Sequence, residues 1–439
     1  MKTDQAADAL AYLAAAEKEA LDIPGVNAHT ERRVIASAAV VGAGTMGGGI
    51  AMSLANAGIA VHLLDLDHAA LDRGLAFVRS NYEISVTRGR ISQEEVEARF
   101  ARIVPTTRYD AIANADIVIE AVFEDLDLKR QIFATFDRVM KPGAVLGTNT
   151  STLDIDAIAA ATTRPQDVIG THFFSPANVM RLQENVRGAL TSPETIATVT
   201  DLATKIGKVP VLAGNCDGFI GNRILAVYGR EADFLLEEGA TPWQVDDALK
   251  AFGFPMGVFL MRDMAGLDVG WRIRRHRNKT RDPSERYSPI ADRIYEQGRL
   301  GQKTGSGYYS YEGREASPNQ QTLATIQDVA AELGIVRKPI SDEEIVTRIL
   351  SAIVNEAAKI VEDGIALRAS DIDVTYAHGY GFPKHQGGPM YWAQRRGLAR
   401  VLADVERYHA EHGKLWTPAP LLVRLAAEGG GWRQAPVMS

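Results

Sequence analysis

The sequence contains a single cysteine, Cys216, among 439 residues, so no disulfide can form within the chain. This scarcity indicates a reducing compartment, and we interpret Cys216 as a small packing residue rather than a nucleophile. No apolar run reaches the roughly 18 residues of a membrane-spanning helix, so no membrane span is expected. The N-terminus lacks the basic start and the long apolar block of a secretion signal. These absences predict a cytoplasmic location.

The sequence also lacks a surplus of positive charge. Lys and Arg number 48 and Asp and Glu number 55, which gives a formal net charge of −7 at pH 7. This balance argues against a nucleic-acid-binding protein, although a few local cations could still bind an anionic small molecule. Hydrophobic residues make up 46% of the chain and charged residues 23%, as in ordinary globular proteins. The length suits two or three domains, and we predict no metal site.

Residues 1–37 have the pattern of a helix followed by an irregular linker, with a break at Pro24-Gly25. Beyond them, short apolar runs alternate with helix-compatible stretches up to about residue 216. The apolar runs are 38–41, 59–64, 115–122, 144–146, 167–170 and 209–212. Short buried strands alternating with helices predict an α/β domain at 38–216 with a parallel, doubly wound sheet.

After Cys216 the strand signals stop, and two helical stretches carry an internal repeat. Predicted helical domains at 217–312 and 341–435 are joined by a connection at 313–340. Four matches recur at one spacing of 125 residues, and a fifth follows after a slip of three residues: Arg223-Ile224-Leu225 with Arg348-Ile349-Leu350, Glu231-Ala232 with Glu356-Ala357, Gly239 with Gly364, Asp246 with Asp371, and Gly253-Phe254-Pro255 with Gly381-Phe382-Pro383. We therefore prefer a duplicated domain to the alternative of two unrelated helix pairs.

A Gly-rich motif, G-x-G-x-x-G, follows the first apolar run and opens a helix-compatible stretch. Its residues are Gly42, Gly44, Thr45, Met46 and Gly47, with Ala43 between the first two glycines. Strand, turn and helix in this order form a dinucleotide site, with the pyrophosphate at the helix N-terminus. Asp65, at the end of the next apolar run, is placed to bind the adenine ribose and to repel a 2′-phosphate, which favours NAD over NADP. FAD and a purely structural turn are the alternatives.

Polar residues follow two later strands at the edge of the sheet where ligands bind. Ser151 follows the run 144–146, His172 follows the run 167–170, Glu184 comes twelve residues later, and Asn222 opens the helical region. Oxidation of an alcohol needs a base for the hydroxyl proton, and histidine suits this role near neutral pH. A carboxylate on its other nitrogen would fix the tautomer. The structural alternatives are a core histidine and a surface glutamate.

As a set, seven motifs resemble those of the 3-hydroxyacyl-CoA dehydrogenases, and in particular of the dehydrogenase half of multifunctional β-oxidation enzymes. They are GAGTMGGGIA, EAVFEDLDLK, NTSTL, THFFSPANVMRL, GFIGNR, FGFPMG and GQKTGSGYYSY, spread in order over about residues 36–435. The resemblance implies a Rossmann-type NAD-binding domain, two repeated all-helical domains, and NAD-dependent oxidation of an (S)-3-hydroxyacyl-CoA.

The resemblance also implies roles for individual residues. His172 would be the base, Glu184 its partner, and Ser151 and Asn222 would hydrogen-bond the substrate oxygen. Further cofactor contacts fall on Ala121, Glu124, Lys129, Ser175 and Lys303. Contacts with coenzyme A fall on Asn81 and Arg88 of a helical hairpin at 68–103, where a solvated helix charge is the alternative interpretation of Arg88.

The chain departs from the family pattern in places. Gln183 and Asn185 flank Glu184 where relatives carry apolar residues, and we expect them to loosen the pocket around the acid. Ser175 stands where many relatives have asparagine, and Val258 replaces a proline. Thr347 takes the place of Asn222 in the second helical copy, which predicts that this copy is non-catalytic.

We expect the second copy to pack on the first as a partner subunit does in single-copy relatives. This arrangement predicts a monomer or a weak homodimer, with association with a hydratase or a thiolase as a further expectation. With no hydratase domain in the sequence, the chain is either a stand-alone dehydrogenase or a fragment. Two alternatives for function stay open: a dehydrogenase of a free β-hydroxy acid or carnitine-like compound, and a non-catalytic NAD-binding scaffold.

Overall fold

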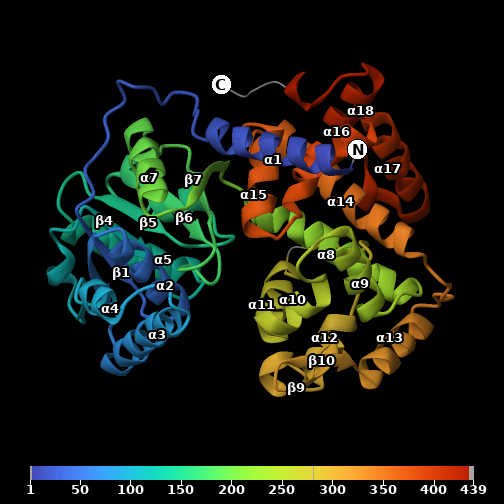
Figure 1. Cartoon of the computed structure of the whole chain (residues 1–439), viewed down its shortest axis with the longest axis horizontal. Helices are drawn as coiled ribbons and strands as arrows, with labels where there is room; N and C mark the ends of the chain where they lie inside the picture. The colour runs from blue at the N-terminus through green and yellow to red at the C-terminus, as the bar shows by residue number, and fades with distance from the viewer. Residues whose placement is uncertain (1, 280, 435–439) are drawn as a thin grey trace. The chain divides into compact units, whose positions relative to one another are not determined.

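The structure is a computed structural model, and it describes residues 2–279 and 281–434 (Figure 1). The chain divides into two compact units. The sheet unit comprises residues 11–222 and 363–380, and the helical unit comprises residues 2–10, 223–362 and 381–434. A segment of the second helical copy, 363–380, therefore belongs by its contacts to the sheet unit.

The sheet unit is built on an eight-stranded sheet in the order β3-β2-β1-β4-β5-β6-β7-β8. Its strands are β1 (Ser37–Val41), β2 (Ala60–Leu64), β3 (Ile103–Thr106), β4 (Ile117–Glu120), β5 (Val145–Thr148), β6 (Val168–Phe173), β7 (Leu182–Arg187) and β8 (Val209–Gly214). All neighbouring pairs are parallel except β6 and β7. The strand order reverses between β1 and β4, which creates the crevice where Rossmann-type sheets bind dinucleotides.

This topology confirms the predicted Rossmann-type sheet, with two strands that the sequence did not indicate. Strand β3 follows a long helical stretch and contains Pro105, and β7 carries Gln183, Glu184 and Asn185 at its centre. Neither has the apolar run by which the other six strands were recognised.

Helices cover the sheet, and most begin at a residue that caps the first turn. Asp125 accepts the N–H of Leu128 at the start of α5, and Ser192 accepts that of Thr195 at the start of α7. The helices that lie wholly or partly in the sheet unit are α1 (Lys2–Glu19), α2 (Thr45–Asn56), α3 (His68–Thr87), α4 (Gln93–Phe100), α5 (Leu126–Val139), α6 (Ile155–Ala159), α7 (Pro193–Lys205) and α15 (Ala369–Gly379), with short 3₁₀ turns η1 (Tyr109–Ile112) and η2 (Pro165–Asp167). Their apolar faces and the strands enclose a core in which Val40, Leu54 and Leu63 are fully buried.

The helical unit consists of two helix sets and a small hairpin. Its elements are α8 (Gly221–Glu238), α9 (Pro242–Phe252), α10 (Val258–Ala265), α11 (Leu267–Arg277), α12 (Ile290–Glu296), η3 (Gln302–Thr304), β9 (Tyr309–Glu312), β10 (Glu315–Pro318), α13 (Gln320–Glu332), α14 (Asp342–Glu362), η4 (Lys384–Gln386), α16 (Pro389–Arg396), α17 (Leu398–His412), η5 (Gly413–Trp416), α18 (Pro420–Ala427) and η6 (Trp432–Gln434). The expectation that strands end at Cys216 is therefore wrong, because β9 and β10 form an antiparallel hairpin. The stretch 313–340, expected to be only a connection, contains α13.

The two helical copies pair reciprocally. Arg223 binds Glu356 across the copies, with 2.7 Å between Nε and Oε1, and Arg348, the repeat equivalent of Arg223, binds Glu231, the equivalent of Glu356, at 3.0 Å. Such mutual exchange of equivalent partners is the pattern of a two-fold subunit interface. The copies therefore pack on each other as two identical subunits would.

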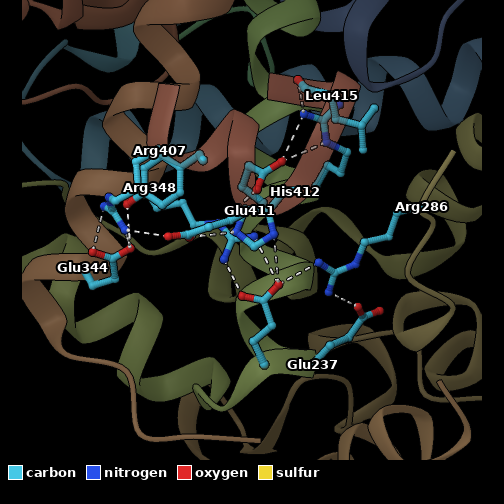
Figure 2. Close-up of polar contacts among 12 residues, drawn as sticks. Glu237, Arg286, Glu344, Arg348, Arg407, Glu411, His412 and Leu415 are labelled. Carbon is cyan, nitrogen blue, oxygen red and sulfur yellow. Dashed lines mark hydrogen bonds and ion pairs between the residues drawn. The ribbon is translucent and has the colours of Figure 1, made fainter. Parts of the chain in front are cut away.

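Further ion pairs surround the Arg348–Glu231 contact within the helical unit. Arg348 also binds Glu238, and Arg286 reaches Glu237 at 2.6 Å. Figure 2 shows these arginine side chains turned toward their carboxylates, together with Arg407, which lies 3.0 Å from Glu344. The Arg348 side chain is only 3% exposed and Glu231, which Arg230 also binds, is fully buried, so this is a buried ion pair.

Candidate active site

The Gly-rich turn joins β1 to α2 at the carboxyl end of β1. Gly42 has a φ of 104°, a left-handed conformation that glycine adopts readily, and a Cβ there would meet the carbonyl of Ala121. A Cβ on Gly47 would overlap the carbonyl oxygen of Gly42. Around Gly44, in contrast, no atom of the described chain lies within 4 Å of where a Cβ would stand. The backbone itself requires the first and third glycines, and the space beside the second is open to a ligand.

Helix α2 begins at Thr45, which is exposed, and continues with the half-buried Met46. No side chain caps its first turn, so its N–H groups are available to an anion. Asp65 lies against the same turn because its Oδ2 accepts the N–H of Ala43 at 2.9 Å. The residues present therefore fit a dinucleotide, with its pyrophosphate at α2 and a ribose near Asp65.

His172 and Glu184 meet through the register of two antiparallel strands. They are directly paired residues of β6 and β7, and 2.8 Å separates Nδ1 of His172 from Oε2 of Glu184. The histidine side chain is 7% exposed and the glutamate side chain is fully buried. The other carboxylate oxygen, Oε1, accepts the backbone N–H of Gly221 at 3.0 Å. With Nδ1 held by the acid, Nε2 is the ring nitrogen left to exchange a proton with a ligand.

Aromatic rings fix the imidazole from the sides. The ring of Phe174 lies 4.4 Å from that of His172, and the ring of Phe219 lies 5.8 Å away, centroid to centroid. Phe219 is fully buried and has a φ of 50°, next to Gly218 with a φ of 80°. This tight turn directs the chain so that Gly221 and Asn222 come next to Glu184 and the end of β5.

Asn222 and Ser151, the two predicted substrate-binding residues, are neighbours. Nδ2 of Asn222 lies 3.4 Å from the carbonyl oxygen of Ser151, and the Ser151 hydroxyl donates to Oε1 of Glu124 at 3.0 Å. Glu124 also accepts the N–H of Ser151 and the hydroxyl of Thr150. Burial opposes the charge of Glu124, but Lys129, 3.4 Å away, and these hydrogen bonds outweigh it and hold its pKa below the usual range.

Lys129 also forms a buried ion pair with Glu120, which the sequence did not predict. Glu120 ends strand β4 at 0% exposure and binds Lys129 Nζ at 2.7 Å. Its other oxygen accepts the hydroxyl of Thr148, and Oε1 also accepts the N–H of Val122. A charge directly ending a buried apolar strand was the signal that could have found it, because a buried acid needs such partners. Because Glu120 ends β4 and Thr148 ends β5, the hydrogen bond between them joins the carboxyl ends of these two strands.

The remaining predicted contacts lie at several places. Ala121 directly follows β4 and donates its N–H to Val41, and Ser175 is exposed just beyond β6. Asn81 and Arg88 lie on and at the end of α3, and the Arg88 side chain is exposed. Lys303 belongs to the helical unit, where it forms an ion pair with Asp268.

The expectation that polar neighbours loosen the pocket around Glu184 is wrong. Alternate residues of a strand point to opposite faces, so Gln183 and Asn185 lie on the other side of the sheet from Glu184. There the amide of Gln183 donates to Asn185 at 2.8 Å, and Asn185 donates to Thr200 at 3.3 Å. Both side chains are buried, and Glu184 stays inaccessible to solvent.

Two negative findings concern residues 2–279 and 281–434. In this part of the chain, no three His, Cys, Asp or Glu side chains gather in a way that would hold a metal ion. Within the same ranges, every helix is too short or too polar to cross a bilayer.

Family models match most of the chain. Residues 37–216 match the model described as "3-hydroxyacyl-CoA dehydrogenase, NAD binding domain". Residues 218–311 and 345–434 each match "3-hydroxyacyl-CoA dehydrogenase, C-terminal domain", so both helical copies belong to one domain type.

Individual relatives agree with these matches. The chain is 45% identical over 426 residues to the peroxisomal bifunctional enzyme of Danio rerio, which covers 92% of this chain and 59% of that protein. It is similar in structure to 3-hydroxybutyryl-CoA dehydrogenase from Escherichia coli K12, with a TM-score of 0.79, 29% identity, and 90% of this chain and 99% of that chain covered. The dehydrogenase part of multifunctional enzyme 1 from C. elegans matches with a TM-score of 0.69 and 30% identity, over 94% of this chain and 96% of that chain. The chain thus spans about three-fifths of the length of the curated relatives it matches.

Proposed function

The chain belongs to the 3-hydroxyacyl-CoA dehydrogenase family, and we propose that it reversibly oxidises (S)-3-hydroxyacyl-CoA to 3-oxoacyl-CoA with NAD, in fatty-acid β-oxidation or related acyl-CoA metabolism. One observation carries the proposal. A buried His172–Glu184 pair, 2.8 Å apart, lies near the carboxyl end of β6, and the dinucleotide-type Gly-rich turn lies at the carboxyl end of β1, so both are at the same edge of one sheet. A base beside a hydride acceptor is the arrangement that alcohol oxidation requires.

In this proposal His172 is the base. Its Nε2 takes the proton of the 3-hydroxyl while the carbon–oxygen bond becomes a carbonyl, and in reduction it returns that proton. Glu184 accepts a hydrogen bond from the N–H at Nδ1 and stabilises the imidazolium that forms, as the acid of a catalytic triad does. Bound NAD supplies the acceptor for the hydride that leaves the same carbon. The N–H of Gly221 binds Oε1 of Glu184 and so helps to keep Oε2 directed at the ring.

The substrate oxygen would be held by two groups. The amide of Asn222 presents N–H donors, and the Ser151 hydroxyl lies in the same hydrogen-bonded cluster with Glu124. Donors aimed at an oxygen that gains negative charge stabilise the transition state, and they do so best where the donors are fixed beforehand. The N–H of Ser151 bound to Glu124 fixes this residue, and its hydroxyl would turn its one hydrogen from Glu124 to the substrate oxygen when the substrate binds.

Coenzyme A recognition is assigned to α3, where Asn81 and Arg88 lie. Asn81 Nδ2 donates to the Phe77 carbonyl within the helix, which leaves its Oδ1 as an acceptor, and the exposed Arg88 guanidinium suits a phosphate.

We assign the non-catalytic role to the second helical copy and propose a monomer or weak dimer, because the reciprocal pairing of the two copies already forms a two-fold interface within the chain. Association with a hydratase or a thiolase, and the cytoplasmic location, stay predictions.

The first experiment mixes the purified chain with NADH and acetoacetyl-CoA and follows the loss of NADH absorbance. We expect steady oxidation of NADH and much slower oxidation of NADPH, since Asp65 disfavours a 2′-phosphate. Failure to turn over short, medium and long 3-oxoacyl-CoAs, with NADH shown to bind, would overturn the proposal and favour a non-catalytic NAD-binding protein.

A second experiment separates coenzyme A esters from free β-hydroxy acids as substrates. Free coenzyme A should compete with the acyl-CoA, and Arg88→Glu should weaken this competition. Arg400→Glu, which reverses an exposed charge on α17, is the matched control and should behave like the wild type. Turnover of the free acid without inhibition by coenzyme A would instead support the free-acid dehydrogenase.

A further inference from the structure

The side chain of Asn222 is held by a tyrosine from the second helical copy. Tyr380 directly follows α15 and donates its hydroxyl hydrogen to Oδ1 of Asn222 at 2.8 Å. Its ring fills the space beside Gly221, where an added Cβ would overlap it. Both residues belong to the sheet unit, although 158 positions separate them in the sequence.

A second tyrosine holds the backbone of the same dipeptide. Tyr376 donates to the carbonyl oxygen of Gly221 at 3.2 Å, and its ring stacks on that of Tyr380 at 4.8 Å between centroids and 17° between planes. Because the N–H of Gly221 binds Glu184, the Gly221–Asn222 segment is fixed at three points. Two of these points come from α15 and its end.

We propose that Tyr380 and Tyr376 are positioning residues through which the non-catalytic copy orients the amide of Asn222. This proposal rests on the proposed function and deepens it. An asparagine amide can present either its oxygen or its NH₂ group after a half-turn about its last bond. The Ser151 carbonyl can only accept, so it keeps Nδ2 on its side, and the Tyr380 hydroxyl, which donates to Oδ1, holds the amide in this orientation.

The selected orientation is the one that reduction of a carbonyl needs. One N–H of Nδ2 lies near the Ser151 carbonyl, and the other remains to donate to the substrate oxygen. The opposite orientation would bring a carbonyl oxygen against an oxygen that gains negative charge, and the transition state would lose its donor. In this proposal Tyr380 acts through Asn222.

The ring of Tyr380 also supports the site laterally. It packs edge-on against Phe174, with 5.4 Å between centroids, and Phe174 in turn contacts the ring of His172. Replacing Tyr380 by phenylalanine would keep these ring contacts and remove only the hydroxyl. This makes Tyr380→Phe a clean probe of the hydrogen bond.

A matched control exists at another residue of α15. Tyr12 of α1 donates to Asp373 at 2.7 Å, so Tyr12→Phe also removes one tyrosine hydroxyl that binds α15, but one that does not bind Asn222. If α15 matters only as packing, both substitutions should act alike. If Tyr380 orients Asn222, only Tyr380→Phe should lower turnover.

The kinetic test measures kcat and KM for acetoacetyl-CoA and NADH. We expect Tyr380→Phe to lower kcat roughly 5- to 10-fold, the effect of about one hydrogen bond, with KM for NADH unchanged. Tyr12→Phe should keep the wild-type kcat, and adding Tyr380→Phe to Asn222→Ala should cause no further loss. A wild-type kcat for Tyr380→Phe, an equal loss in Tyr12→Phe, or a full further loss in the Asn222→Ala background would each overturn the proposal.

Hydrogen exchange tests the same claim without turnover. In the double variant Tyr376→Phe/Tyr380→Phe, backbone amides of residues 218–224 should exchange faster than in the wild type, whereas Tyr12→Phe should leave them unchanged. Unchanged exchange in the double variant contradicts the proposal. If the wild type reduces no 3-oxoacyl-CoA, the proposed function fails, and the exchange result still decides whether the tyrosines hold this segment.

Discussion

His172 and Glu184 face each other across β6 and β7 as a directly paired couple, at the point where the strand direction of the sheet reverses. A parallel strand at this position would reverse the direction of β7 and move Glu184 relative to His172. The one antiparallel strand pair of the described sheet is therefore the feature that brings His172 and Glu184 together.

Glu184→Gln tests the charge of this couple. The amide keeps the size of the side chain, but it cannot stabilise an imidazolium and can present an N–H to Nδ1, which favours the wrong tautomer. We expect kcat to fall roughly 10²- to 10⁴-fold with NADH binding preserved. Gln183→Met, one residue away but on the opposite face of the sheet, should retain nearly full activity. Similar losses in both variants would mean that the strand, and not the acid, was disturbed.

Two glycine-to-alanine substitutions in the Gly-rich turn should differ: one should weaken NADH binding and the other should destabilise the fold. Gly44→Ala adds a methyl group into the open space beside the turn, so thermal stability should stay the same while NADH affinity falls at least about tenfold. Gly47→Ala forces a methyl group onto the Gly42 carbonyl and should destabilise the fold by about 1–3 kcal/mol. Calorimetry of NADH binding and thermal unfolding separate the two effects. Unchanged NADH affinity in Gly44→Ala would contradict the assigned pyrophosphate position.

The ion pairs of the helical unit should differ in their contribution to stability. Arg348→Met leaves Oε2 of the buried Glu231 without its cation, although Arg230 still binds Oε1, and should lower the free energy of unfolding by about 3 kcal/mol. Arg407→Met removes a more exposed pair with Glu344 and should cost less than about 1 kcal/mol. Urea unfolding of both variants, followed by circular dichroism, makes the comparison. Equal costs would argue against a special role for the Arg348 pair.

Lys208 predicts a dependence of stability on pH. Its Nζ donates to the carbonyl oxygens of Ala177 and Met180 in the segment after β6, and burial lowers its pKa to about 8. In the unfolded chain the pKa is about 10.4, so between about pH 8 and 10.4 the unfolded state binds more protons than the folded state. Below about pH 8 the folded protein bears the full free-energy cost of burying the charged ammonium group of Lys208. This cost disappears as the pH rises from about 8 to about 10.4.

The wild type should therefore gain stability relative to Lys208→Met from about pH 8 to about pH 10. Urea unfolding of the two proteins at a series of pH values measures the difference. A difference that stays constant, or that shrinks, over this range would show that Lys208 does not titrate as its burial implies.

The sequence predicted the architecture of the sheet where apolar runs mark the strands. It could not predict β7, since the residues at its centre are polar: Gln183 and Asn185 pair with each other on one face, and Glu184 is satisfied by His172 and Gly221 on the other. Periodicity and apolar content do not detect a buried strand whose polar groups find partners only after folding.

The candidate site shows the same limit. Ser151, His172 and Asn222 stood out because each follows a strand or opens a helix near a recognisable motif. Tyr376 and Tyr380 gave no such signal, because they lie in the repeat where Thr347 takes the place of Asn222. Only the folded chain shows that the segment carrying them leaves its own helical copy and packs on β7 and β8.

The most direct measurement of the central claim is the turnover of His172→Gln with a 3-hydroxyacyl-CoA and NAD, beside its affinity for NADH. If Nε2 of His172 takes the hydroxyl proton, kcat falls roughly 10²- to 10⁴-fold while NADH binds as in the wild type. A variant that turns over at a near-normal rate would contradict the account.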